Sequence, residues 1–161
     1  MAQRPTFDMS KLTTADKILL GAGILLFVDS FFAWQRACAT FLGTKICGGS
    51  WSAWSGSGSF AGILMGLLVI AMVIWMGLQL AGVNLQLGVP GATIGAGLVL
   101  GTVIFGVIKF LFVVANHASI GAWLGIILLV VLAYGGYMKM QEPKTAGSAP
   151  PAMGGPPPPP A

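Results

Sequence analysis

The residues that could do chemistry in this chain are few, and two of them are ionisable groups inside apolar stretches. Asp29 lies in the first apolar stretch of the sequence and Lys109 lies in the third. A charge at membrane depth costs about 2.5–3.5 kcal/mol on insertion scales, so such a residue is by default a functional-site candidate. Asp29 and Lys109 could pair as a structural contact, or they could line the path of a small transporter or channel subunit.

The depth of the two residues favours the pair. Asp29 precedes Trp34, the expected outer end of its helix, and a rise of 1.5 Å per residue places it roughly 7–8 Å below that end. Lys109 precedes Asn116, at the outer end of another helix, by a distance of roughly 10 Å. An intramembrane pair of Asp29 and Lys109 is therefore predicted. In the alternative, Lys109 snorkels outward while Asp29 is hydrated or protonated.

Two cysteines and one histidine are the other reactive residues. Cys38 and Cys47 fall in one predicted outer loop, where a disulfide is expected that contributes roughly 2.5–3 kcal/mol by chain entropy. Two free thiols are the alternative, and two thiols are too few ligands for a structural metal site. His117 is interpreted as a solvated residue of a short connection. With no nucleophile motif and no carboxylate pair, we expect no enzyme activity, no cofactor and no metal.

Four membrane helices are expected to position these residues. The chain has 161 residues, of which 56% are hydrophobic and 7% charged, whereas soluble domains carry about 25% charged residues. Apolar segments at about 15–34, 60–82, 92–115 and 120–138 are each long enough to cross a ~30 Å hydrocarbon core and too uniform for half-buried strands. The sequence thus predicts an all-α membrane protein, a four-transmembrane-helix bundle.

The chain divides into three parts around these helices. Residues 1–14 are expected to be a cytoplasmic segment, residues 15–142 the transmembrane domain, and residues 143–161 a disordered, Pro-rich cytoplasmic tail. Residues 35–59 are read as an outer loop and residues 83–91 as an uncharged turn. Thr13 and Asp16 fit the capping pattern of the first helix start. A cleavable signal peptide ending near Cys38 is the alternative for the first helix, and Asp29 argues against it.

Orientation follows from the distribution of basic residues near the membrane ends. With both termini cytoplasmic, the inner side carries Arg4, Lys11, Lys17, Lys139 and Lys144, and the outer side carries Arg36 and Lys45. This excess predicts a multi-pass membrane protein with both termini on the cytoplasmic side. Trp34, Trp51 and Trp54 are then expected to be interface anchors at the outer surface.

Glycines spaced four residues apart are expected to form helix-packing faces. The pairs are Gly62 with Gly66, Gly91 with Gly95, Gly97 with Gly101, and Gly121 with Gly125. Small residues let helix backbones approach closely in lipid, either within one chain or between copies, so a homo-oligomer is possible. The short connections favour packing within the chain.

Four stretches carry a resemblance to a known family. They are Phe-Phe-Ala-Trp at 31–34, Ser-Ala-Trp-Ser-Gly at 52–56, Ser-Ile-Gly-Ala-Trp-Leu-Gly at 119–125, and Ala-Tyr-Gly-Gly-Tyr-Met-Lys-Met-Gln-Glu at 133–142. Over roughly residues 15–142 the chain resembles a family of small four-pass membrane proteins of actinobacteria with no established activity. The resemblance implies a bacterial plasma membrane and a four-helix bundle. The cysteine pair departs from that family's pattern.

The function expected from these observations is non-enzymatic. The net charge of +4 contains no cluster of Lys or Arg, so no nucleic acid is expected as a partner. We expect a structural or interaction (scaffold or adaptor) component of the membrane, surrounded by the lipid bilayer. The five prolines at 156–160 could bind a protein partner with an aromatic groove, or they could be an inert spacer. The alternative function is the transporter or channel subunit that uses Asp29 and Lys109.

Overall fold

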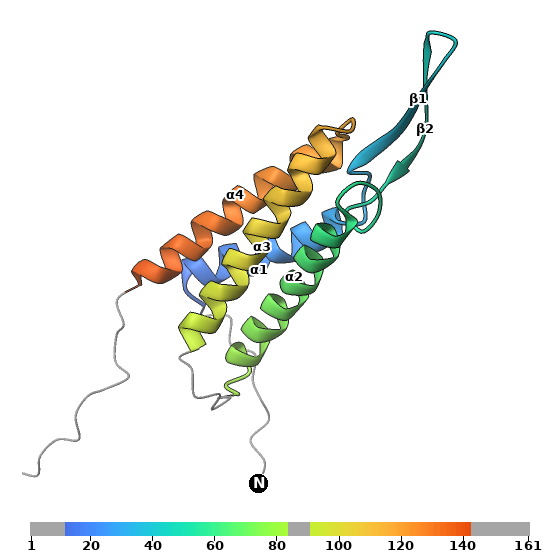
Figure 1. Ribbon diagram of the computed structural model, residues 1–161. Helices are drawn as coiled ribbons and strands as arrows, with labels where there is room; N and C mark the ends of the chain where they lie inside the picture. Colours follow the sequence, from blue (N-terminus) through green and yellow to red (C-terminus); the bar gives the residue numbers. More distant parts are fainter. Residues whose placement is uncertain (1–11, 84–90, 143–161) are drawn as a thin grey trace, which may run out of the picture.

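The computed structural model describes residues 12–83 and 91–142, and within them the chain is mostly helical with one small two-stranded sheet. The elements in chain order are α1 Thr14–Asp29, β1 Gln35–Phe41, β2 Thr44–Trp51, α2 Ser59–Leu80, α3 Gly91–Val114 and α4 Ile120–Gln141 (Figure 1). The predictions for the N-terminal segment, for most of the 83–91 turn and for the Pro-rich tail lie outside the described residues.

The four helices pack side by side and are called here the helical body. Helix α2 lies against α3, α1 lies against α4, and α3 lies against α4 (Figure 1). We call the end that carries β1 and β2 the hairpin end, and the opposite end, where α1 begins and α4 finishes, the far end. The capping box predicted at Thr13 and Asp16 is confirmed at the start of α1.

Helices α2, α3 and α4 are long and apolar enough to cross a membrane, with 22, 24 and 22 residues. Helix α1 has only 16 residues and covers roughly 24 Å at 1.5 Å per residue. The predicted extension of this helix to residue 34 is therefore wrong. The helix ends early because other backbone contacts compete with its continuation. The Ala53 N–H donates to the Ser30 carbonyl, and the Phe32 N–H donates to the Asp29 carbonyl.

A β-hairpin stands where a loop was expected at residues 35–59. Strands β1 and β2 pair antiparallel, with Cys38 opposite Cys47, around a turn at Leu42 and Gly43 whose φ values are both positive. Every residue of β2 is exposed. The strands were missed because most of the sheet is exposed, so the sequence lacks the alternation of apolar and polar residues that marks a half-buried strand.

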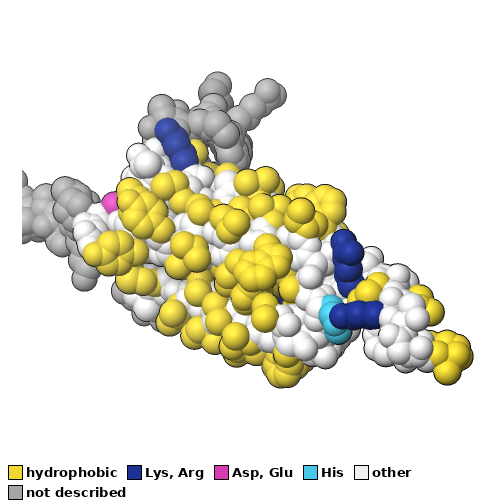
Figure 2. All heavy atoms as spheres, turned by 90° about the horizontal axis from the view of Figure 1, so that it is seen from above, with side chains coloured by type: hydrophobic (Ala, Val, Ile, Leu, Met, Phe, Trp, Pro, Cys, Tyr) yellow, Lys and Arg dark blue, Asp and Glu magenta, His cyan; other side chains and the backbone are white. Residues whose placement is uncertain are grey.

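The helical body is apolar on its outside as well as in its core. Side chains such as Leu25, Leu100 and Val130 are 57%, 59% and 64% exposed. Figure 2 shows apolar side chains over most of the visible helical face, with the basic side chains toward its two ends. A water-facing helix would place polar residues on that face. Lipid is the solvent that suits this surface. The core is formed by residues that include Leu26, Met65, Val69, Met72, Leu129 and Leu132.

Candidate functional site

Lys109 holds a connection against α3 from inside the protein. Its side chain is fully buried, and Nζ donates hydrogen bonds of 2.8 Å to the carbonyl oxygens of Ser55 and Ser57. Those carbonyls belong to the segment between β2 and α2. Hydrogen bonds from a charged donor are about twice as strong as neutral ones, so Lys109 fixes the entry to α2.

The predicted pair of Asp29 and Lys109 is wrong. Asp29 is 2% exposed, and its Oδ2 accepts a hydrogen bond of 3.1 Å from Trp34 Nε1, while its Oδ1 has no hydrogen-bond partner among the described residues. Asp29 faces α4, where its Oδ2 would lie 2.9 Å from a Cβ added to Gly125. Lys109 faces the other way, toward the 52–58 segment, so peptide carbonyls take the place of the carboxylate.

The indole of Trp34 is buried at the hairpin end rather than placed in a membrane interface. Its exposed fraction is 0%, and it fills the notch that Gly121 and Gly125 leave on α4. The prediction that Trp34 is an interface anchor is therefore wrong. Trp54 is partly buried and donates to Ser30 Oγ at 2.9 Å, while Trp51 is 46% exposed. Anchoring by Trp51 and Trp54 stays a prediction.

The predicted glycine faces meet different neighbours. A Cβ at Gly62 would collide with the carbonyl oxygen of Ala53, and one at Gly66 would collide with the Trp54 ring. Gly62 and Gly66 therefore contact an irregular segment and an indole ring, as Gly121 and Gly125 do. No second helix of the described residues packs its backbone against these four positions. In α3, a Cβ added to Gly91 would lie 3.2 Å from the Gln79 side chain, and one added to Gly101 would lie 3.0 Å from Leu68. A Cβ added to Gly95 or Gly97 would meet no described atom within 4 Å.

Sequence reasoning also missed close approaches at four other glycines within the helices. A Cβ there would press on Met72, Leu129, Leu19 or Val99 of a neighbouring helix, and the positions are Gly23, Gly106, Gly135 and Gly136. None of these four glycines lies four residues from another glycine, so the i, i+4 pattern could not find them.

The hairpin is tied at two places. The predicted disulfide between Cys38 and Cys47 joins β1 to β2 across the ladder. At its base the Arg36 N–H donates to the His117 carbonyl, and Lys45, which lies closer to the turn, contacts His117 Nε2 through its Nζ. His117 is exposed, as its interpretation as a solvated residue expects, and it also links the hairpin to the α3–α4 connection.

Apolar side chains gather near the tip of the hairpin. Phe41 is 66% exposed, Leu42 is 90% exposed and Ile46 is 57% exposed. The tip stands clear of the helical body (Figure 1). An exposed apolar group on a two-stranded sheet with free edges is a typical binding surface for another chain.

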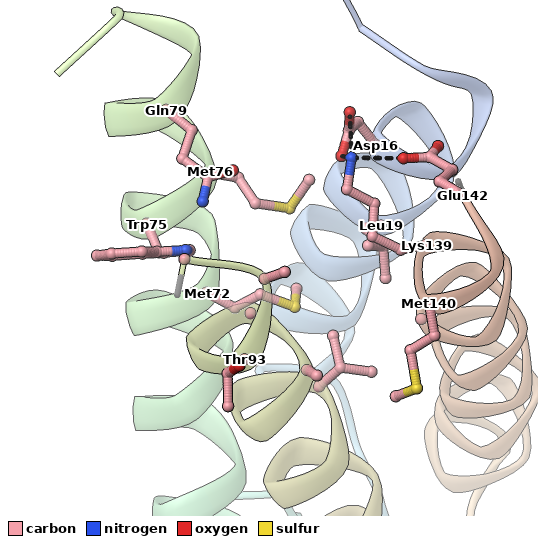
Figure 3. A pocket seen from close by; sticks show the side chains of 16 residues that line it. Asp16, Leu19, Met72, Trp75, Met76, Gln79, Thr93, Lys139, Met140 and Glu142 are labelled. Carbon is pink, nitrogen blue, oxygen red and sulfur yellow. Dashed lines mark hydrogen bonds and ion pairs between the residues drawn. The ribbon is translucent and has the colours of Figure 1, made fainter. Parts of the chain in front are cut away.

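A pocket of about 520 Å³ opens at the far end and is lined by residues of all four helices. At its mouth Lys139 Nζ lies 2.9 Å from Asp16 Oδ1 and 2.8 Å from Glu142 Oε2 (Figure 3). The contact with Lys139 lowers the pKa of Glu142 below its usual range. Deeper in, the lining is apolar and includes Met72 and Met76.

Sequence analysis treated Asp16 as a helix cap and Lys139 as a topology charge, so it missed this pocket. One signal was present. An acid in the first turn of α1 and a base in the last turn of α4 meet when two antiparallel helices pack together. The space beside them depends on side-chain sizes on α2 and α3, which no spacing rule reports.

Comparison with known protein families, curated proteins and solved structures finds no match for this chain. Within residues 12–83 and 91–142, no three His, Cys, Asp or Glu side chains are grouped so that they could hold a metal ion. The hairpin and the far-end pocket are the features of the described residues that could carry a function.

Proposed function

We propose that this chain is a non-enzymatic, multi-pass protein of the bacterial plasma membrane that presents its disulfide-tied hairpin to a protein partner on the outer side. In this proposal the helical body is a four-helix transmembrane bundle and both termini are cytoplasmic. The apolar length of α2, α3 and α4 and the apolar outer surface of the body support it.

The short α1 fits a fourth crossing because the backbone that follows it is supplied with internal partners. The Ser30 carbonyl accepts from the Ala53 N–H, and the Trp34 N–H donates to the Trp51 carbonyl. Irregular backbone is tolerated at membrane depth where protein buries it and satisfies its polar groups. Residues 30–34 would thus complete the crossing that α1 begins.

The exposed hairpin is the observation that carries the interaction role. A lone two-stranded hairpin is marginal in water, yet this one is fixed by a disulfide and by contacts at its base. Its apolar tip contributes nothing to the core of the helical body, because Phe41 and Leu42 stand exposed. A partner could pair with the free strand edges and cover the tip.

The transport alternative loses its original basis. It relied on Asp29 and Lys109 as path-lining charges, but both side chains are buried and neither lines the far-end pocket. Lys109 is held by two carbonyls, which accounts for its charge without a moving ion.

Site-specific photo-crosslinking in intact cells tests the interaction role. A photoreactive residue at Leu42 samples the tip, and one at Leu100, which is also exposed but on a helix, is the matched control. We expect a discrete protein adduct from Leu42, lost in the Cys38→Ser/Cys47→Ser variant, and only lipid adducts from Leu100. Lipid adducts alone from Leu42, or equal protein adducts from both positions, would contradict the proposal.

A further inference from the structure

The far-end pocket exists because one helix contributes almost no side-chain volume to it. The first turns of α3 line the pocket with Gly91, Ala92, Thr93, Gly95 and Ala96. A Cβ added to Gly95 meets no described atom within 4 Å, so the described residues leave the space beside it unfilled. At about 520 Å³ the cavity has the volume of an ordinary small-molecule site.

The lining changes from charged to apolar along the depth of the pocket. Asp16, Lys139 and Glu142 stand at the mouth, while Met72 lies further in (Figure 3). From α2, Trp75 and Gln79 flank the same space, on the side opposite the ion cluster. A ligand that carries both a charged group and a large apolar body matches this gradient.

The sign of the charges selects a cation. Two carboxylates, those of Asp16 and Glu142, share the single ammonium group of Lys139, which leaves a formal excess of one negative charge. Lys139 is the one basic residue in the described lining, and both carboxylates already engage it. An anionic ligand would have to compete with those carboxylates, whereas a cation would complete their neutralisation.

The apolar lining also suits a polarisable cation. Met72, Met76 and Met140 place flexible thioethers around the space, and thioethers make favourable contacts with aromatic rings. Trp75 also lines the pocket, and the indole of tryptophan is the aromatic group with the strongest attraction for cations.

We propose that the far-end pocket is a binding site for a hydrophobic monovalent cation. Its positive group lies beside the carboxylates of Asp16 and Glu142, and its aromatic or aliphatic groups pack among the methionines and Trp75. The site lies at the opposite end of the helical body from the hairpin, so the proposal does not depend on the interaction role (Figure 1).

Two ions of nearly the same shape and opposite charge test the proposal on the full-length protein in detergent. Tetraphenylphosphonium is the cation and tetraphenylborate the anion, each measured by equilibrium dialysis against protein-free micelles of the same detergent. We expect saturable binding of the phosphonium ion and binding of the borate weaker by at least about tenfold. Equal binding of both ions, binding of neither, or a co-purified phospholipid that the cation does not displace would overturn the proposal.

Two glycine variants locate the binding. Gly95 lines the pocket and Gly97 does not, although both lie on α3 and neither has an atom within 4 Å of an added Cβ. Gly95→Leu should weaken phosphonium binding by at least about tenfold, because the side chain occupies the cavity, while Gly97→Leu should leave it unchanged. Equal loss in both variants would place the binding elsewhere and overturn the proposal.

A charge variant that adds no bulk checks the role of the carboxylates. Glu142→Gln removes the excess negative charge. We expect it to weaken binding of the phosphonium ion by up to about fivefold, the size of effect that exposed charge pairs have. The same variant should strengthen binding of tetraphenylborate or leave it unchanged. Unchanged binding of the phosphonium ion would overturn the assignment of the charged end, even if Gly95→Leu fails to fold.

Discussion

The two ends of the helical body use glycines in opposite ways. At the hairpin end, Gly62 and Gly125 are notches that polypeptide fills, with the Ala53 carbonyl in one and the Trp34 ring in the other. At the far end, Gly95 faces a cavity that no side chain of the described residues fills. One end is closed by the connections that run over it, and at the other end the described residues leave a pocket between the helices.

This difference shows what glycine spacing does and does not encode. An i, i+4 pair removes side chains from one helix face, which permits a close approach. The spacing does not specify whether a helix, an indole, a peptide carbonyl or a ligand makes that approach. Gly62 with Gly66 and Gly91 with Gly95 are identical as patterns, yet the first pair is closed and the second borders a pocket.

The largest effect should come from removing the cation that closes the hairpin end. Lys109→Met leaves the carbonyls of Ser55 and Ser57 buried without a donor. We expect a loss of at least about 3 kcal/mol in the free energy of unfolding, because each hydrogen bond from a charged group contributes about 1.5–3 kcal/mol. The control at the far end is Lys139→Met, which should cost about 1 kcal/mol or less.

Unfolding in detergent also separates this arrangement from an ion pair. We expect the Asp29→Asn/Lys109→Met double variant to be no more stable than Lys109→Met, because the two side chains face different neighbours. Substantial recovery in the double variant would show that the two charges interact directly. In that case the hairpin end would be closed by an ion pair, and the carbonyl contacts would be secondary.

A pair of alanine substitutions makes the comparison of closed and open glycines directly. In Gly62→Ala the new methyl group meets the Ala53 backbone, which cannot move aside cheaply, so we expect a loss of about 1–3 kcal/mol. Gly95→Ala meets open space, and its higher helix propensity should stabilise the protein by up to about 1 kcal/mol. Thermal unfolding of both variants in one detergent is the measurement. Similar losses at both sites would remove the distinction between the two ends.

The sequence predicts α2, α3 and α4 well and fails where contacts between distant segments decide. The three helices follow from apolar length, and their bounds differ from the predicted ones by only a few residues. The end of α1 does not follow, because it depends on the Ala53 N–H reaching the Ser30 carbonyl from beyond the hairpin.

The candidate sites were predicted less completely than the helices. The disulfide was found because two cysteines in one short loop have few alternatives. The partner of Lys109 was not found, since a peptide carbonyl carries no signature in the residue type. The far-end pocket depends on which side chains are missing from a space, and a list of residues present does not reveal that.

Reduction of the disulfide should loosen the hairpin and spare the helical body. The Cys38–Cys47 bond closes a short loop, and its removal should cost the hairpin roughly 2.5–3 kcal/mol on the chain-entropy estimate. Because β2 is exposed along its whole length, we expect that cost to stay local. Hydrogen exchange of the Cys38→Ser/Cys47→Ser variant should show faster exchange in β1 and β2 and unchanged protection in α2 and α3. Lost protection in α2 would show that the hairpin end is one cooperative unit.

The smallest effect is expected in acid and should be confined to the far end. Lys139 lowers the pKa of Glu142 in the folded protein, so the stabilisation from this contact is present at neutral pH, above the unfolded value of 4.5, and is lost as the pH falls through the lowered value. The Glu142 side chain is 31% exposed, so solvent screening limits the contribution to about 1 kcal/mol or less. We expect Glu142→Gln to be slightly less stable than the unchanged protein at pH 7 and equally stable once Glu142 is protonated. Subtracting the two unfolding curves at each pH cancels every other titrating group. A difference that persists in acid would mean that Glu142 stabilises the far end through packing or a neutral hydrogen bond, and the negative charge at the mouth of the pocket would then be smaller than its carboxylates imply.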